Sequence, residues 1–421
     1  MENNSIPINK NIIIRYGLPG FLLAFTTLPL YLSTPLIYEG KGGLTLATIG
    51  LILMLVRFSD AVTDPIIGKF IDSTKKNRFI RWLVPSLLIL SIGFFLLFNP
   101  PKNITNLYLI ITWLSIFLLI VSISNGAATL AYQSWIITWS EIPQDQINLV
   151  SSREFFSILG VITASFFATQ NMFLEMSIVV VSFCIFCVLA IRPLRKISLP
   201  KKKRSGLIFF KAVFTSKTRG MFFIFGINAF ANSIPALLFI FFVKDILLLE
   251  SRVAGFLLIT YFLFAIGSIP IWSKLIKRLG PNLVWINAIL LSVLGFIWAL
   301  FLGPGNFLFF LLICIVTGFA LGAELLCPPL ILANKINQLK QNGLLEGSFF
   351  GVFNLFLKLS LALSSGTILP IISYFGYTSS GSPSAFSLSL MQFLYAGLPC
   401  FLKLVCLVCI IKFLYQPKGK K

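Results

Sequence analysis

Long apolar segments alternate with short polar segments along nearly the whole chain. Twelve apolar segments, each bounded by turn-forming or charged residues, lie near residues 17–38, 45–70, 79–98, 106–138, 151–169, 173–194, 219–244, 253–274, 280–302, 306–334, 345–376 and 385–414. A helix needs about 20 apolar residues to cross a bilayer. Runs such as residues 51–56 and 307–316 are apolar on every side, which excludes a transmembrane β-barrel. The pattern predicts an all-α integral membrane protein with 12 transmembrane helices.

Composition supports this prediction and limits the chemistry. Of the 421 residues, 57% are hydrophobic and 11% are charged, whereas a soluble domain is about 45–50% apolar and about 25% charged. There is no room for a large soluble domain. The chain has no histidine, so its cysteines cannot complete a mixed zinc site. Proton or cation chemistry must therefore use carboxylates.

The distribution of Lys and Arg predicts the orientation. With twelve spans, 27 of the 34 basic residues fall on the side of the two termini and four on the opposite side. The positive-inside rule places both termini in the cytoplasm, for a multi-pass protein of the plasma or inner membrane. The net charge of +21 reflects this bias and an affinity for anionic lipids. A nucleic-acid partner is not expected.

A polar stretch between Arg192 and Arg219, with a basic run at residues 201–204, divides the chain near its middle. We expect an N-terminal six-helix bundle (1–194), a basic cytoplasmic linker (195–218) and a C-terminal six-helix bundle with a short basic tail (219–421). Similar basic turns follow the second and eighth spans. Two pseudo-symmetric bundles are typical of the major facilitator fold, whose substrate site lies near the midplane between the halves.

The second span contains an unusual group of charges. Asp60 and Asp64 are four residues apart and share a helical face with Arg57. Two close carboxylates in a low dielectric repel each other, so one takes a proton or both share a cation such as Na⁺. Thr63 and Thr129 could complete the cation's oxygen ligands. The alternative is an Arg57–Asp60 ion pair that only fixes helix packing, with Asp64 neutral.

Other ionisable residues within spans are functional candidates because charge is costly at bilayer depth. Lys358 is expected to pair with the second-span carboxylates. Arg153 is either a cavity ligand or an interfacial cation. Lys403 is expected to snorkel toward the cytoplasm, and Glu324 to be a protonated packing residue, without an assigned role.

Two further features concern the cavity and its closure. Trp135 either stacks on a sugar face or packs between helices. After the second span, Gly68 and Asp72 belong to a turn in which Asp72 is expected to tie the loop to a neighbouring helix as a gate.

Together these residues resemble the glycoside–pentoside–hexuronide:cation symporter family, the melibiose-carrier-like branch of the major facilitator superfamily. The main match is Arg57-x-x-Asp60-Ala61-x-x-Asp64-Pro65-x-x-Gly68, and further matches are Tyr16-Gly17, Ser152-Arg153-Glu154, residues 228–235, Glu346-Gly347, Lys358 and Phe375-Gly376-Tyr377. The resemblance implies that Asp60 and Asp64 bind Na⁺ or H⁺. It also implies that Lys358 links the cation and substrate sites, and that Trp135 and Arg153 belong to the sugar pocket.

Two positions depart from the melibiose carrier. Ala24 and Ala131 stand where that carrier has acidic sugar ligands. Losing two acids while keeping Arg57, Arg153 and Lys358 makes the cavity more positive. An anionic substrate, such as a uronide or another organic anion, therefore gains weight, and related lysophospholipid symporters make a lysolipid an alternative.

The sequence thus predicts a secondary active symporter of a sugar, glycoside or uronide, working by alternating access. Na⁺ or H⁺ is the coupling ion, no cofactor is expected, and the carrier is expected to be a monomer. An enzyme is not expected, because no acid–base or metal cluster lies near an interface. The alternative of another class is a transport-inactive membrane receptor or scaffold.

Overall fold

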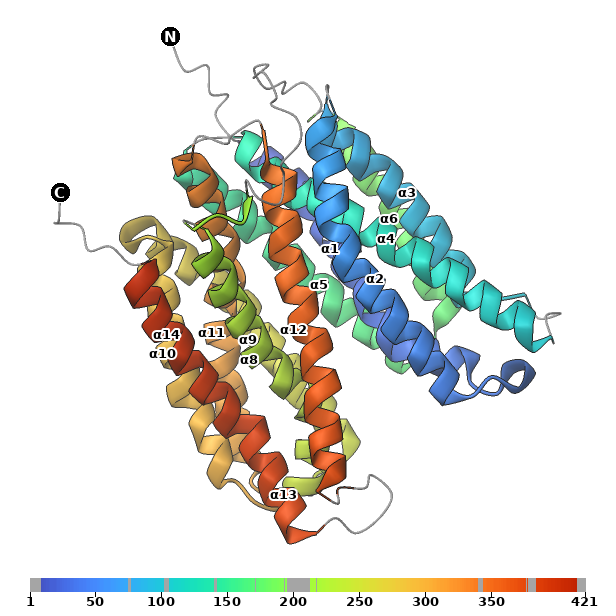
Figure 1. The fold of residues 1–421 in the computed structure, drawn as a ribbon, viewed down its shortest axis with the longest axis vertical. Coiled ribbons are helices and arrows are strands. Elements are labelled where there is room, and N and C mark those ends of the chain that lie inside the picture. Colours follow the sequence, from blue (N-terminus) through green and yellow to red (C-terminus); the bar gives the residue numbers. More distant parts are fainter. Residues whose placement is uncertain are drawn as a thin grey trace. The chain divides into compact units, whose positions relative to one another are not determined.

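Helices account for the regular structure of the described residues, and no strand occurs among them. The computed structural model describes residues 9–74, 77–101, 106–139, 142–170, 172–192, 194, 213–216, 218–339, 344–375, 377 and 384–414 (Figure 1). Most of the predicted basic linker (195–212) and the end of the basic tail (415–421) lie outside these residues.

The helices follow the predicted spans. They are α1 (Lys10–Tyr38), α2 (Leu46–Ser73), α3 (Arg78–Phe98), α4 (Leu107–Trp139), α5 (Pro143–Thr169), α6 (Phe173–Ile191), α8 (Arg219–Phe241), α9 (Ser251–Leu279), α10 (Pro281–Phe296), α11 (Phe307–Gln338), α12 (Glu346–Tyr374), α13 (Ala385–Gln392) and α14 (Leu398–Phe413). The last predicted span comprises α13, a π-helical turn η5 (Phe393–Gly397) and α14. A second π-helical turn, η3 (Phe242–Ile246), extends α8.

Eleven helical segments within the described residues are long and apolar enough to cross a membrane. The α2 helix is not among them, although it occupies the second predicted span. It carries five ionisable side chains, which are Arg57, Asp60, Asp64, Lys69 and Asp72. The helix that departs most from an apolar span is therefore the one that holds the predicted cation site.

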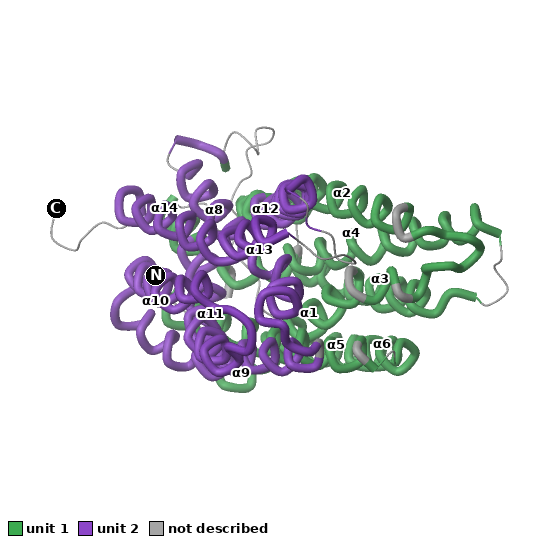
Figure 2. The backbone as a smooth tube through the Cα atoms, turned by 90° about the horizontal axis from the view of Figure 1, so that it is seen from below, with its two compact units in different colours: residues 1–213, 332–355 green, residues 214–331, 356–421 purple. Residues whose placement is uncertain are grey.

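The chain forms two compact units (Figure 2). Unit 1 contains residues 1–213 and 332–355, and unit 2 contains residues 214–331 and 356–421. The first boundary falls inside the predicted linker. Residues 332–355 join unit 1 because the start of α12 packs closely on α2, as described below.

Unit 1 is built around α1, α4 and α5. The α1 helix packs along α5, α3 packs against α4 and α6, and α2 packs against α4. A Cβ atom at Gly160 would lie 2.3 Å from the backbone oxygen of Phe21, so this crossing of α1 and α5 requires glycine. The buried hydroxyl of Tyr16 donates to the Tyr132 carbonyl at 2.8 Å, and the Tyr132 hydroxyl donates to the Tyr16 carbonyl. These bonds fix α1 to α4.

Unit 2 packs α8 against α14, and α10 against α9 and α14. The two π-helical turns meet in its apolar core, where the rings of Phe242 and Tyr395 stack with centroids 4.0 Å apart. Both rings are buried. Each turn widens its helix locally, and this pair of rings fills the space between them.

Candidate functional site

The predicted cation ligands of α2 are buried side chains on one helix. Asp60 and Asp64 lie one turn apart, both buried, and Arg57 is half-buried. The Thr63 hydroxyl donates to the Asp60 carbonyl oxygen at 3.1 Å, so in this conformation it is engaged with its own helix. The structure thus keeps Arg57, Asp60 and Asp64 on α2, inside unit 1.

The end of α2 holds the start of α12. The Asp72 carboxylate accepts hydrogen bonds from the backbone N–H groups of Gly347 and Ser348 at 2.8 and 2.7 Å, and from the Ser348 hydroxyl at 2.6 Å. These N–H groups belong to the first turn of α12, where a carboxylate is favoured by the helix dipole. The predicted contact between Asp72 and a neighbouring helix is therefore confirmed.

Three glycines allow this approach of α2 and α12. A Cβ atom at Gly68 would lie 2.2 Å from the Gly347 carbonyl oxygen, and one at Gly351 would lie 2.8 Å from the Asp64 carbonyl oxygen. Neither contact leaves room for a side chain. Gly68 therefore acts by permitting contact, and α12 touches α2 at the level of Asp64.

A cavity of about 200 Å³ lies between α1, α4 and α5. Its small and polar lining residues include Ala24 from α1, Asn125, Thr129 and Gln133 from α4, and Arg153 and Ser157 from α5. The lining does not include Asp60 or Asp64 among the described residues. Thr129, which we predicted as a cation ligand, lines this cavity, and its hydroxyl donates to Asn125 Oδ1 at 3.2 Å.

Arg153 is the charged group with donor capacity in this cavity. It is 5% exposed, and its Nε and Nη2 donate to Oε1 of the neighbouring Glu154, Nε at 2.8 Å. Its Nη1 has no hydrogen-bond partner among the described residues, nor does the buried Oε1 of Gln133 on the same lining. A buried polar group without a partner is costly, so the cavity is suited to a ligand that accepts from Arg153 and donates to Gln133.

Trp135 and Ala131 lie elsewhere. Trp135 is buried, with its ring centroid 6.0 Å from that of Tyr16, and neither it nor the buried Ala131 belongs to the cavity lining. This arrangement favours the packing role of Trp135 over stacking on a sugar. Of the two alanines that replace acidic ligands, Ala24 lines the cavity.

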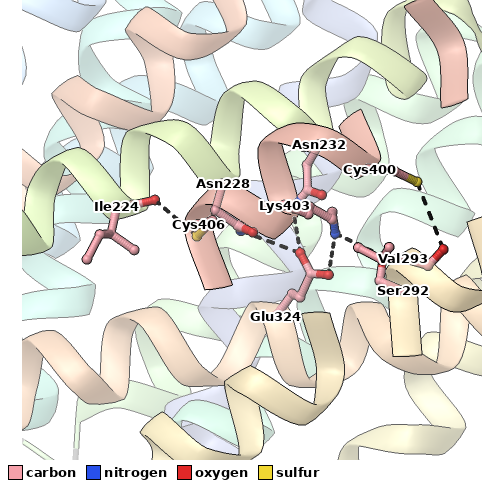
Figure 3. A network of polar contacts seen from close by, with 9 residues as sticks. All are labelled: Ile224, Asn228, Asn232, Ser292, Val293, Glu324, Cys400, Lys403 and Cys406. Carbon is pink, nitrogen blue, oxygen red and sulfur yellow. Dashed lines mark hydrogen bonds and ion pairs between the residues drawn. The ribbon is translucent and has the colours of Figure 1, made fainter. Parts of the chain in front are cut away.

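Unit 2 contains an ion pair that the sequence analysis missed. The Lys403 ammonium lies 2.5 Å from Glu324 Oε1 (Figure 3), and both residues are buried. The expectation that Lys403 snorkels is wrong, because Glu324 compensates its charge inside the bundle. Glu324 is correspondingly an ion-pair partner rather than an isolated packing residue. The available signal was one mid-span charge of each sign on two spans of the same half.

Comparison with known proteins identifies the family. A family model described as "MFS/sugar transport protein" matches residues 14–416. The chain belongs to this family of the major facilitator superfamily. It is 26% identical over 429 residues to the "Uncharacterized symporter YnaJ" of Bacillus subtilis (strain 168), covering 92% of this chain and 87% of that protein.

Solved transporters share the fold. A bacterial homologue of the iron transporter ferroportin, in an outward-facing state, matches with a TM-score of 0.70 at 14% identity, over 95% of this chain and 99% of that one. The E. coli fucose:proton symporter FucP matches with a TM-score of 0.68 at 14% identity, over 96% and 98%. The protein is therefore a multi-pass membrane transporter of the major facilitator fold, and not an enzyme.

Lys358 of this transporter lies on the part of α12 that belongs to unit 2, where it is half-buried. Its pairing with the carboxylates of α2 stays a prediction, as do the cytoplasmic position of both termini and the division into two six-helix bundles.

Proposed function

We propose that this transporter is a cation-coupled symporter of a sugar, glycoside or uronide, within the melibiose-carrier-like branch of its family. The observation that carries the proposal is the cavity beside Arg153, which offers an open guanidinium donor next to amide and hydroxyl groups. Such donors suit a hydroxylated molecule, and the guanidinium favours one with a carboxylate. A uronide meets both requirements.

Asp60 and Asp64 are proposed to bind the coupling cation, Na⁺ or H⁺. Binding relieves the repulsion between two carboxylates of one buried helical turn. The α2 helix packs on α4, and α4 supplies Asn125, Thr129 and Gln133 to the cavity. The α4 helix is therefore the element through which cation binding would organise the substrate site. Coupling of this kind is reciprocal, so each ligand raises the affinity of the other.

Asp72 and Gly68 are proposed to form part of a gate. The three hydrogen bonds from α12 to Asp72, together with the glycine contact, hold the α2–α12 crossing closed. Alternating access requires such contacts to break and reform as the carrier changes state. Lys358 on the same α12 is proposed to respond to the substrate and the cation together.

The relatives are consistent with ion coupling. YnaJ is named a symporter and FucP a fucose:proton symporter, and no cofactor is needed for such a cycle. Arg153 also fits another organic anion or the phosphate of a lysolipid, so these remain the alternative substrates.

Charge movement on a solid-supported membrane tests the proposal. Proteoliposomes of the full chain receive Na⁺ jumps or pH jumps with a neutral methyl glycoside, a hexuronate or a lysolipid. We expect a substrate-dependent current with the hexuronate, driven by one of the two cations. A current with the lysolipid alone would replace the sugar assignment, and binding without any translocation would favour a receptor.

Asp64→Asn is the decisive variant. We expect it to abolish gradient-driven accumulation even where exchange survives, because the cation loses a charged ligand. Glu250→Gln is the matched control, since Glu250 is an exposed carboxylate before α9. Full accumulation by Asp64→Asn would refute the cation site.

A further inference from the structure

The ion pair of unit 2 stands where polar groups from four helices converge. Figure 3 shows Glu324 of α11 facing Lys403 of α14, with Asn228 and Asn232 of α8 and Ser292 of α10 around them. Glu324 and Lys403 are only 6% and 7% exposed. Ionisable groups at such depth are functional candidates with a named partner.

The carboxylate is well supplied with donors in this conformation. Oε1 accepts from the Lys403 ammonium, and Oε2 accepts from the Asn232 amide at 2.7 Å and from the Asn228 amide at 3.4 Å. Lys403 also donates to the Ser292 hydroxyl at 3.0 Å. These contacts stabilise the ionised form of Glu324.

One acceptor at the same place lacks a donor. Asn228 is 6% exposed, and its Oδ1 is buried without a hydrogen-bond partner among the described residues. An ionised Glu324 cannot supply a donor, but a protonated one can. With the Asn228 amide turned over, the carboxylic O–H would donate to Oδ1. The cluster thus holds partners for both protonation states of Glu324.

We propose that Glu324 is a proton-binding site of unit 2, controlled by its ion pair with Lys403. The added proton forms an O–H bond on Oε2, and the lysine ammonium keeps its charge and its bond to Ser292. This site is separate from the carboxylates of α2 and does not depend on which substrate the transporter carries.

Lys403 is the charge that faces Glu324 within the described part of the chain. The other titratable side chains that interact with the pair are Tyr261 of α9, Cys327 of α11, and Cys400 and Cys406 of α14. Phenols and thiols are ordinarily neutral near pH 7. The distance between Lys403 and Glu324 therefore decides which form is favoured, so any motion of α14 against α11 changes proton occupancy.

Infrared spectroscopy of the purified full chain tests this directly and needs no substrate. The C=O stretch of a protonated carboxylic acid is followed from about pH 8 down to about pH 5, the range below which ordinary carboxylates also titrate. We expect wild type to gain an acid band that Glu324→Gln loses entirely and Asp64→Asn retains. The retained band separates this site from the proposed cation site.

A second variant leaves the ion pair intact. Asn228→Leu removes the acceptor and is expected to shift the frequency of the same band, because the acid O–H loses its partner. A purely structural ion pair would not produce this shift. The proposal is overturned if neither Glu324→Gln nor Asn228→Leu alters the wild-type acid bands across the range, since Glu324 would then be permanently ionised.

Discussion

The two buried ion pairs of this transporter differ in what they leave unused. In unit 1, Arg153 and Glu154 are sequence neighbours on α5, and the guanidinium keeps Nη1 free of partners among the described residues beside a cavity. In unit 2, Lys403 and Glu324 come from α14 and α11, and both carboxylate oxygens are bonded.

The difference separates a pair that holds helices from a pair that presents a donor. An ion pair between distant helices links them, and removing one partner leaves an uncompensated buried charge. An ion pair between neighbours on one helix links nothing, so its burial is explained by what the open donor binds. Stability should therefore depend mainly on the pair in unit 2, and ligand affinity mainly on Arg153.

The largest effect is expected from breaking the pair in unit 2. Lys403→Met should lower the free energy of unfolding by about 3–5 kcal/mol, because Glu324 loses its counter-ion. The deficit should shrink as the pH falls, since protonation removes the buried negative charge. Denaturant unfolding of purified protein at several pH values measures both effects.

The double variant Glu324→Gln/Lys403→Met is the control. Without either charge, the free energy of unfolding should return close to the wild-type value. If the double variant were as unstable as Lys403→Met, lost packing of the lysine chain would explain the result and the charge argument would fail.

The next effect concerns Arg153. Arg153→Lys keeps the positive charge but loses the planar fork that can hold Glu154 and a ligand together. We expect hexuronate affinity to fall about 10- to 100-fold, the equivalent of one charged hydrogen bond of about 1.5–3 kcal/mol, with little change in stability. Titration calorimetry and unfolding measure the two quantities; a large loss of stability with unchanged affinity would reverse the roles of the two pairs.

Much of the fold follows from the sequence, because each span is encoded locally by its own apolar run. The contact of Asp72 was also predictable, since a carboxylate after a glycine in a tight basic turn has few structural uses other than capping a neighbouring helix. The Glu324–Lys403 pair was not predictable from local pattern. Its partners are 79 residues apart, and each alone resembles an isolated charge.

The candidate site was predictable only in part. Motif spacing identified Asp60, Asp64 and Arg153, because helical periodicity and residue chemistry mark them. The cavity wall was not predictable, since Ala24 and Gln133 carry no pattern and become neighbours of Arg153 only when α1, α4 and α5 pack. Thr129 was assigned to the cation for its hydroxyl group, but which helix gap it enters depends on the rotation of α4.

A gain of charge would give unit 1 an arrangement like that of unit 2. Ala24→Asp adds a carboxylate to the cavity that Arg153 lines, and it should pair with the open donor. We expect hexuronate affinity to fall about tenfold or more, as expected when one charged hydrogen bond is taken by a competitor. Ala131→Asp is the matched control, since Ala131 is outside the cavity lining. Unchanged affinity in Ala24→Asp would mean that the ligand does not use Arg153.

The smallest effect distinguishes the two ligands of unit 1. Thr129→Val keeps the shape of the side chain but removes the hydroxyl that donates to Asn125 Oδ1. The Asn125 amide in turn donates to Thr26 and Thr27 on α1 at 3.1 and 3.2 Å, so Thr129 orients a cavity group rather than a cation ligand. Hexuronate affinity should fall roughly fivefold, for one hydrogen bond of about 1 kcal/mol, while the apparent affinity for the coupling cation, measured at saturating hexuronate, stays the same. The opposite result, weaker cation binding with unchanged hexuronate affinity, would place Thr129 in the cation site, because a ligand lost from one site acts on the other only through their coupling.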